Sequence, residues 1–222
     1  MTGRLYCIDN DIIKKLATFE LFDETIALFK ASRSEVRILE TAKYKFRSLE
    51  NRNREKAIRP EARFVNYAKA IELAESLSQI AAMVDDTLFT QLSNLEDIDP
   101  GEATLTAYAV QFLSKRDAGD VFILTGDKRY LRSFSSVGWP LLPIRFHHRF
   151  WCLEQLVLWN IREYGFDAVR KKIVPARECD QACKAIFGSG FSSTEENAIA
   201  TATGYIESLR EETGILLNPY PD

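Results

Sequence analysis

Three acidic residues each stand where a strand-like or loop segment gives way to a helix. Asp9 follows the apolar residues 5–8, and Asp127 follows the apolar residues 121–126. Glu102 stands at the start of an alanine-rich helical segment. In an open α/β sheet, ligands bind beyond the carboxyl ends of the strands, where such junctions lie. We therefore expect the fold to gather the three junctions at one edge of a sheet.

Hydrophobic periodicity predicts alternating strands and helices over the first two thirds of the chain. The all-apolar residues 121–124 are typical of a central parallel strand that is covered on both faces. The alternation predicts an α/β fold with a doubly wound parallel sheet. We expect strands at residues 5–8, 36–39, 95–98, 121–124 and 139–146, and helices at about residues 10–26, 41–82, 85–93, 103–113 and 128–134.

The pattern changes after residue 146, where only helical periodicity remains. Predicted helices cover residues 150–161, 166–173, 181–187 and 193–213. We therefore expect two parts: an α/β domain at residues 1–146 and a helical C-terminal extension or subdomain at residues 147–222.

Composition excludes several classes of protein. No segment of the 222 residues approaches the ~20 consecutive apolar residues of a membrane span, and the N-terminus lacks a signal-peptide pattern, so we expect no membrane partner and a cytoplasmic location. The four cysteines are scattered and complete no zinc site. The net charge of −3 excludes nucleic-acid binding by bulk charge and leaves only a local basic patch.

Residues 43–63 form such a patch, with eight Lys and Arg residues. They are either phosphate contacts or a solvated helix face paired with Glu50 and Glu55. Four aromatic residues are interleaved with this stretch, and their spacing favours core positions over base stacking: Tyr44, Phe46, Phe64 and Tyr67.

Each of the three acids also has a structural explanation as a helix cap. Asp99-Pro100-Gly101-Glu102 matches a capping box, and Asp9 and Asp127 could cap the helices that follow them. Three anions at one sheet edge would repel one another unless a cation lies among them. Oxygen ligands without a histidine or cysteine cluster favour Mg²⁺ or Mn²⁺ as that cation.

Three short motifs, taken in order, resemble the PIN-domain nucleases over about residues 1–146. They are Ile8-Asp9-Asn10-Asp11, Pro100-Gly101-Glu102-Ala103 and Leu124-Thr125-Gly126-Asp127-Lys128-Arg129. The resemblance implies a PIN-like three-layer α/β/α sandwich with a mostly parallel central sheet. It also implies metal-dependent hydrolysis of phosphodiester bonds, usually in RNA. It implies that Asp9, Glu102 and Asp127 are catalytic metal ligands. It also implies that Thr125 belongs to the catalytic site, because it matches the position where the family carries a hydroxyl before the last acid.

The chain departs from the family pattern at one position. Many members carry a further acid about where Lys45 stands, and Glu40 is the nearest substitute ligand for the metal. Glu40 could instead be a surface residue at the start of the helix. Lys128 and Arg129, next to the last acid, are either contacts to the substrate phosphate or solvent-facing residues of a first helical turn.

We therefore expect a Mg²⁺- or Mn²⁺-dependent endoribonuclease, toxin-like or RNA-processing, with RNA as its substrate and an inhibitory protein or a second copy as its partner. An alternative is a catalytically degenerate PIN-like module that binds RNA or protein. A further alternative is an aspartyl-phosphate phosphatase, because Asp9-Asn10-Asp11 has the required spacing. The chain lacks the lysine and paired acids that such phosphatases need.

Overall fold

The computed structural model describes residues 3–55, 64–80, 86–115, 119–136 and 141–221. The strands are β1 (Leu5–Ile8), β2 (Val36–Leu39), β3 (Ser78–Ile80), β4 (Val121–Thr125) and β5 (Phe150–Cys152). The α-helices up to β5 are α1 (Asn10–Thr18), α2 (Phe22–Leu28), α3 (Ala42–Glu55), α4 (Tyr67–Ser76), α5 (Asp86–Ser93), α6 (Pro100–Leu113), α7 (Lys128–Ser135) and α8 (Leu141–Arg145). Those after β5 are α9 (Leu153–Tyr164), α10 (Phe166–Ile173), α11 (Gln181–Ile186) and α12 (Glu195–Thr213).

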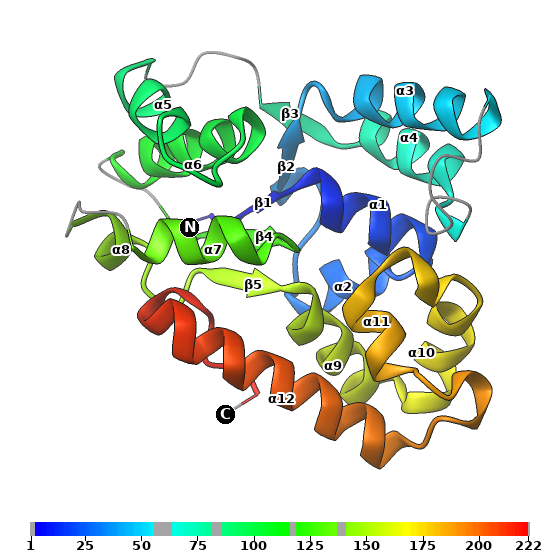
Figure 1. The fold of residues 1–222 in the computed structure, drawn as a ribbon. Coiled ribbons are helices and arrows are strands. Elements are labelled where there is room, and N and C mark those ends of the chain that lie inside the picture. Colours follow the sequence, from blue (N-terminus) through cyan, green and yellow to red (C-terminus); the bar gives the residue numbers. More distant parts are fainter. Residues whose placement is uncertain (1–2, 56–63, 81–85, 116–118, 137–140, 222) are drawn as a thin grey trace.

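The five strands form one parallel sheet in the order β3-β2-β1-β4-β5 (Figure 1). Ile8 pairs with Leu124, so β1 and β4 end side by side. The chain leaves β1 toward β2 and β3 and returns to β4 on the other side of β1. The boundary between β1 and β4 is therefore the topological switch point, where the connections diverge and leave a crevice.

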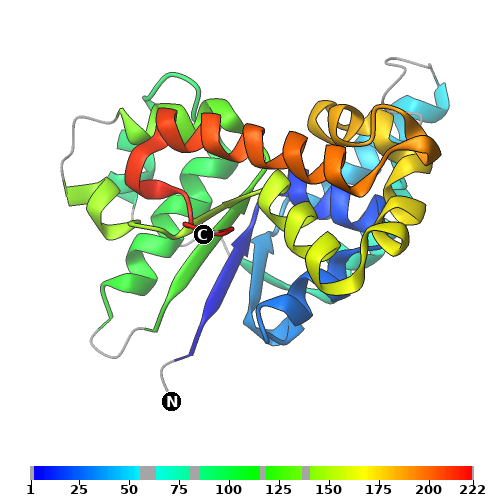
Figure 2. The same cartoon turned by 90° about the horizontal axis from the view of Figure 1, so that it is seen from below.

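Helices cover both faces of this sheet (Figure 2). On one face, Trp151 of β5 stacks on Trp159 of α9, and Phe29 after α2 meets both rings. On the other face, the fully buried Phe150 packs against the α7 rings of Tyr130 and Phe134. The α/β sandwich with a parallel sheet is confirmed.

Two of the predicted strands are wrong. Residues 95–98 form turns and bends, and Asp97 has a φ of 64°, in the left-handed region, which no continuous strand accommodates. In the 139–146 segment, residues 141–145 form helix α8, while residues 139–140 lie outside the described ranges. The last strand is instead β5, which follows this segment.

The predicted helices at 41–82 and 10–26 are each divided. The first contains α3, α4 and the strand β3, and Pro60 lies outside the described residues. The second is interrupted between α1 and α2, where Glu20 takes a φ of 54°. The other predicted helices are confirmed to within a few residues, except that the final one is capped by Thr194 and not by Ser193.

The helices after β5 pack directly on the sheet domain. β5 follows residue 146 yet pairs with β4, so the sheet extends past the boundary that we predicted there. α12 contacts both α9 and α7. Within the described ranges, no helix combines the length and apolarity that a membrane crossing requires.

The aromatic cluster under β5 gives a prediction about stability. Phe150→Ala removes a fully buried ring that contacts Tyr130, Phe134 and Phe146, and we expect it to lower the free energy of unfolding by about 3–5 kcal/mol. Phe191→Ala is the matched control, because Phe191 is 59% exposed. Urea unfolding measures both variants, and equal effects would contradict the packing described for β5.

Candidate functional site

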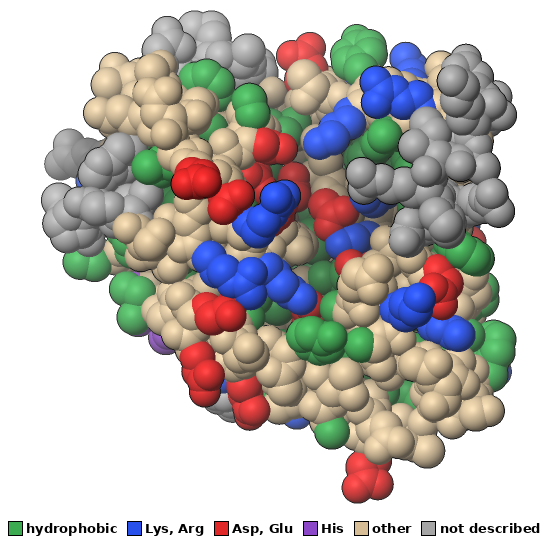
Figure 3. Space-filling model, in the orientation of Figure 1, with side chains coloured by type: hydrophobic (Ala, Val, Ile, Leu, Met, Phe, Trp, Pro, Cys, Tyr) green, Lys and Arg blue, Asp and Glu red, His purple; other side chains and the backbone are tan. Residues whose placement is uncertain are grey.

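A cavity of about 1200 Å³ opens at the carboxyl ends of the strands. Acidic and basic side chains gather side by side around this hollow (Figure 3). Its polar lining includes Asp9, Asp11, Lys14, Lys15, Lys45, Arg52, Asn53, Asp99, Glu102, Asp127, Lys128, Arg129, Glu154, Glu178, Asp180 and Gln181. The predicted acids at positions 9, 102 and 127 therefore face one space, although they come from three separate junctions.

Asp9 is placed by the pairing of β1 with β4. Its backbone N–H donates to the carbonyl of Leu124 at 2.9 Å, which extends the ladder by one residue beyond β1. Asp9 is 9% exposed and holds the N-cap position of α1, but its side chain makes no capping hydrogen bond, so the structural explanation of this carboxylate as a cap is not observed. Burial, with the charges of Asp11 and Asp99, raises the pKa of Asp9 to about 6.

Asp127 is placed by the turn between β4 and α7. Its carboxylate accepts from the backbone N–H of Arg129 at 2.8 Å and of Tyr130 at 3.3 Å, so it does cap α7. The fully buried Thr125 hydroxyl accepts from the N–H of Asp127 at 3.1 Å. Thr125 thus orients the backbone of Asp127, while the carboxylate caps α7 and lines the cavity.

Glu102 is placed by the capping box that its sequence predicts. It accepts from the N–H of Asp99 at 2.8 Å, and Asp99 accepts from the N–H of Glu102 at 2.8 Å. Its side chain is only 5% exposed, and burial, with the charges of Asp99, Asp127 and Asp9, raises its pKa to about 8. A Cβ at Gly101 would lie 2.8 Å from Leu39 Cδ1, so glycine allows α6 to begin this close to β2.

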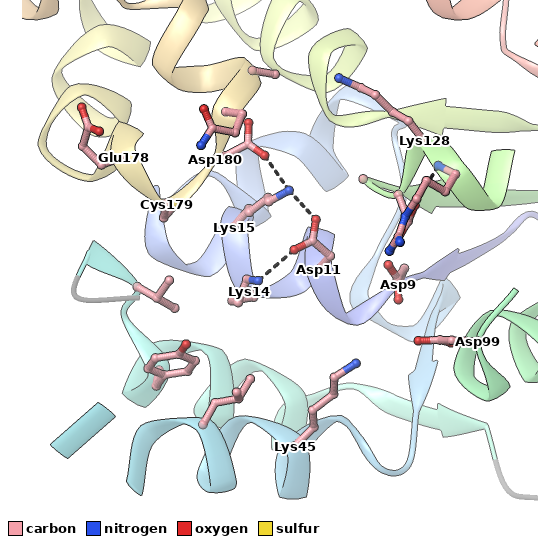
Figure 4. Close-up of a pocket in the computed structure, with 18 of the residues that line it drawn as sticks. Asp9, Asp11, Lys14, Lys15, Lys45, Asp99, Lys128, Glu178, Cys179 and Asp180 are labelled. Carbon is pink, nitrogen blue, oxygen red and sulfur yellow. Dashed lines mark hydrogen bonds and ion pairs between the residues drawn. The ribbon is translucent and has the colours of Figure 1, made fainter. Parts of the chain in front are cut away.

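The structure separates Glu40 from the other predicted ligands. Glu40 is exposed and is not part of the cavity lining, whereas Lys45 does line it. In Figure 4, Lys45 extends from its helix toward the side where Asp9 and Asp11 lie, and its charge acts to lower the pKa of Asp9. A cation therefore faces the acids where we looked for a fourth carboxylate.

Sequence reasoning missed an ion-pair network in the cavity wall. The Asp11 side chain lines the cavity and pairs with Lys14 at 2.8 Å and with Lys15. Lys15 also meets Asp180 at 2.6 Å (Figure 4). Although burial alone would raise it, the pKa of Asp11 falls to about 2 because Lys15 and Lys14 stabilise its charge. The (i, i+3) spacing of Asp11 and Lys14 and the (i, i+4) spacing of Asp11 and Lys15 are the parts of this network that have a sequence signal.

Gly126 keeps this network in contact with the turn that carries Asp127. A Cβ on Gly126 would lie 2.4 Å from Asp11 Oδ2 and 3.1 Å from Lys15 Nζ. Only glycine fits between the turn and these side chains without displacing them. The network therefore braces both the helix that follows Asp9 and the turn before Asp127.

The predicted phosphate contacts also reach the cavity. Lys128 pairs with Glu154 at 2.5 Å, and Arg129 is 72% exposed with its guanidinium 3.7 Å from Asp127. Lys45 and Arg52 line the cavity from α3. In the rest of the basic stretch, Arg47 pairs with Glu75 of α4, and Lys56, Arg59 and Arg63 lie outside the described residues.

The aromatic residues of that stretch divide into two groups. Phe46 and Tyr67 are buried, as predicted, but Tyr44 and Phe64 are 56% and 41% exposed. The prediction of core positions is therefore wrong for these two. Tyr44 carries the ammonium of Lys43 over its ring at 5.1 Å.

The carboxylates of the cavity are chemically suited to a hard divalent cation, because they offer oxygen ligands. Burial and mutual repulsion oppose the ionisation of Asp9 and Glu102, and a bound cation would relieve both effects. Among the described residues, no three His, Cys, Asp or Glu side chains are grouped closely enough to form a metal cage as they stand. The acids thus share a cavity without a preassembled set of ligands.

Comparisons of this chain with models of protein families, with curated proteins and with solved structures found no match. The function therefore has to be inferred from the chemistry of the cavity. Three features of the cavity bear on the function: the acids share one space, they carry negative charge when ionised, and cations lie beside them.

The raised pKa of Glu102 predicts a stability that depends on pH. Without divalent metal, an unfolded Glu102 ionises near its usual pKa of 4.5, whereas the folded one keeps its proton up to about pH 8. The folded state binds more protons in this window, so the carboxyl lowers stability progressively as the pH rises from 4.5 to 8. Glu102→Gln keeps an oxygen for the capping box and removes the charge.

We expect Glu102→Gln to unfold at the same temperature as the parent near pH 4 and at a higher temperature near pH 8 in EDTA. Thermal unfolding across this range measures the difference. A constant difference between the two proteins at every pH would contradict the raised pKa.

Proposed function

We propose that this protein is a divalent-metal-dependent endoribonuclease that hydrolyses phosphodiester bonds at the carboxyl edge of its sheet. The observation that carries the proposal is the meeting of Asp9, Glu102 and Asp127 in one cavity at the switch point between β1 and β4. Helix capping explains the positions of Glu102 and Asp127 but not the buried carboxylate of Asp9.

Mg²⁺ or Mn²⁺ is the cation that such a set of oxygens favours. Asp9, Glu102 and Asp127 would hold it, and Asp99 lies beside them in the same lining. When bound, such an ion lowers the pKa of a coordinated water and neutralises charge on a phosphate. No grouped ligands are preassembled in the described structure, so we expect some of the carboxylates to act through metal-bound waters.

The cations of the cavity support a polyanionic substrate. Lys128 and Arg129 directly follow Asp127 in the sequence and line the cavity, and Lys45 and Arg52 line it from α3. A phosphate placed near the acids would thus have positive side chains on more than one element within the same space. The preference for RNA over DNA rests on the resemblance of the three acid motifs to PIN-domain nucleases, and so does the PIN-like character of the sandwich.

A second candidate is an RNA-binding module without catalytic activity. Two observations favour it: Lys45 faces the cavity where a further acid was expected, and the described acids form no metal cage. Such a protein would use the same cations and bind RNA without metal.

Incubation with labelled single-stranded RNA in Mn²⁺ or EDTA tests the proposal. We expect cleavage in Mn²⁺ alone, and we expect Asp9→Asn and Asp127→Asn to lower the rate at least about 100-fold, because each removes a charge that would hold the metal. Both variants should remain folded by circular dichroism.

Glu40→Gln is the control variant, because Glu40 is an exposed carboxylate outside the cavity lining, and it should cleave like the parent. Labelled DNA and a phosphomonoester separate RNA specificity and phosphatase activity from the proposed reaction. Binding of RNA without cleavage in Mn²⁺ would support the second candidate and contradict the first.

A further inference from the structure

The helices after β5 contribute side chains to the wall of the cavity. Glu154 comes from α9, and Glu178, Asp180 and Gln181 come from the segment that ends in α11. Glu154 and Asp180 each form an ion pair with a lysine of the sheet domain, namely Lys128 and Lys15. The two pairs have the same composition, but they differ in whether the lysine can still bind an anionic ligand.

The positive charge of Lys15 is already offset by carboxylates of the protein and is not available to a ligand. Its ammonium lies between Asp11 and Asp180, and its side chain is 8% exposed (Figure 4). Asp11 also pairs with Lys14, so two carboxylates offset two ammonium groups and leave no net positive charge to attract a phosphate. This pair fastens α11 to α1 and has the character of a structural link.

Lys128 is different because it has one carboxylate partner and remains accessible. Its side chain is 29% exposed, whereas that of Glu154 is only 3% exposed. The ring of Tyr205 from α12 lies 4.8 Å from the ammonium and supports it from the same C-terminal segment. Burial alone would lower the pKa of Lys128, but Glu154 raises it above the usual value, so the ammonium stays charged.

The burial of Glu154 is what makes its hold on Lys128 strong. A carboxylate removed from water needs a charged or hydrogen-bonded partner, and breaking such a pair is costly. Lys128 is therefore kept at one place beside Asp127 and cannot swing freely into solvent. An ammonium that is held in place loses less conformational entropy when it binds an anion.

We propose that Glu154 is a positioning residue that holds Lys128 for contact with a substrate phosphate, so that the helices after β5 complete the RNA-binding site. The inference rests on the proposed function, because it takes RNA as the ligand. It goes further by giving the C-terminal segment a role in that site. Through Lys128, Glu154 strengthens the binding of an anion although it is itself an anion.

RNA binding in EDTA tests this, since metal-dependent cleavage is then absent and affinity alone is measured. Fluorescence anisotropy with a labelled single-stranded RNA gives the dissociation constant over a series of salt concentrations. We expect Lys128→Met to weaken binding about fivefold and to reduce the salt slope by about one, as for the loss of one phosphate contact. Glu154→Gln should also weaken binding, although it removes a negative charge.

Glu178→Gln is the matched control, because Glu178 is another cavity carboxylate from the same segment, paired with Lys184 at 2.8 Å and not with Lys128. Its loss should leave the affinity unchanged or raise it. In the Lys128→Met background, Glu154→Gln should no longer weaken binding. This double variant leaves neither member of the Lys128–Glu154 pair as an unpaired charge, so it separates positioning from a failure to fold.

The results separate a failure of RNA as the substrate from a failure of Glu154 as a positioning residue. A parent protein that neither binds RNA in EDTA nor cleaves it in Mn²⁺ overturns the proposed substrate and this role of Glu154 together. A parent that cleaves RNA in Mn²⁺ but binds none in EDTA overturns the positioning role alone, because RNA binding then needs the metal. A parent that binds RNA while Glu154→Gln binds equally well or more tightly overturns the positioning role alone.

Discussion

The parallel pairing of β1 with β4 is the constraint on which the site depends. It brings the ends of two strands together, so that Asp9 follows one and Asp127 follows the other. The bond from the Asp9 N–H to Leu124 O continues this pairing to the first acid itself. Because the connections from β1 and to β4 diverge at this boundary, the described helices leave a cavity open there.

The cavity holds acids that resist ionisation beside lysines that are already paired. Burial and like charges disfavour the ionised forms of Asp9 and Glu102, while Lys15 is saturated by Asp11 and Asp180. The protein thus leaves its central acids without a full counter-ion from its own described side chains, although Lys45 partly offsets the charge on Asp9. Sites held at such a cost to stability are where ligands commonly bind, because a cation that binds relieves the repulsion.

Local sequence signals predicted the parts of the structure that have local causes. The apolar run of β4, the capping box at Glu102 and the acid after each central strand all depend on neighbours within a few residues. β3 and β5 were missed because each has only three residues, and their identity as strands depends on partners far along the chain. Tertiary packing decides such segments, and the apolar pattern of β5 merges with that of α9.

The same distinction applies to the site. Asp9, Glu102, Asp127, Lys128 and Arg129 all line the cavity that their positions predicted. The contacts made by Glu154 and Asp180 could not be predicted, since each joins residues that the sequence separates widely. Glu40 was considered as a ligand on its nearness in sequence alone, and the fold places it on the surface.

The proposed function requires a divalent cation to bind among carboxylates that otherwise resist ionisation. Titration calorimetry with Mn²⁺ at about pH 7, in two buffers of different ionisation enthalpy, counts the protons released on binding. Since the pKa of Glu102 is about 8, its proton is still bound at this pH, and we predict release of about one proton per ion. Near pH 9.5 the release should fall to almost none. Absence of Mn²⁺ binding, or binding with no proton release at either pH, would contradict the account.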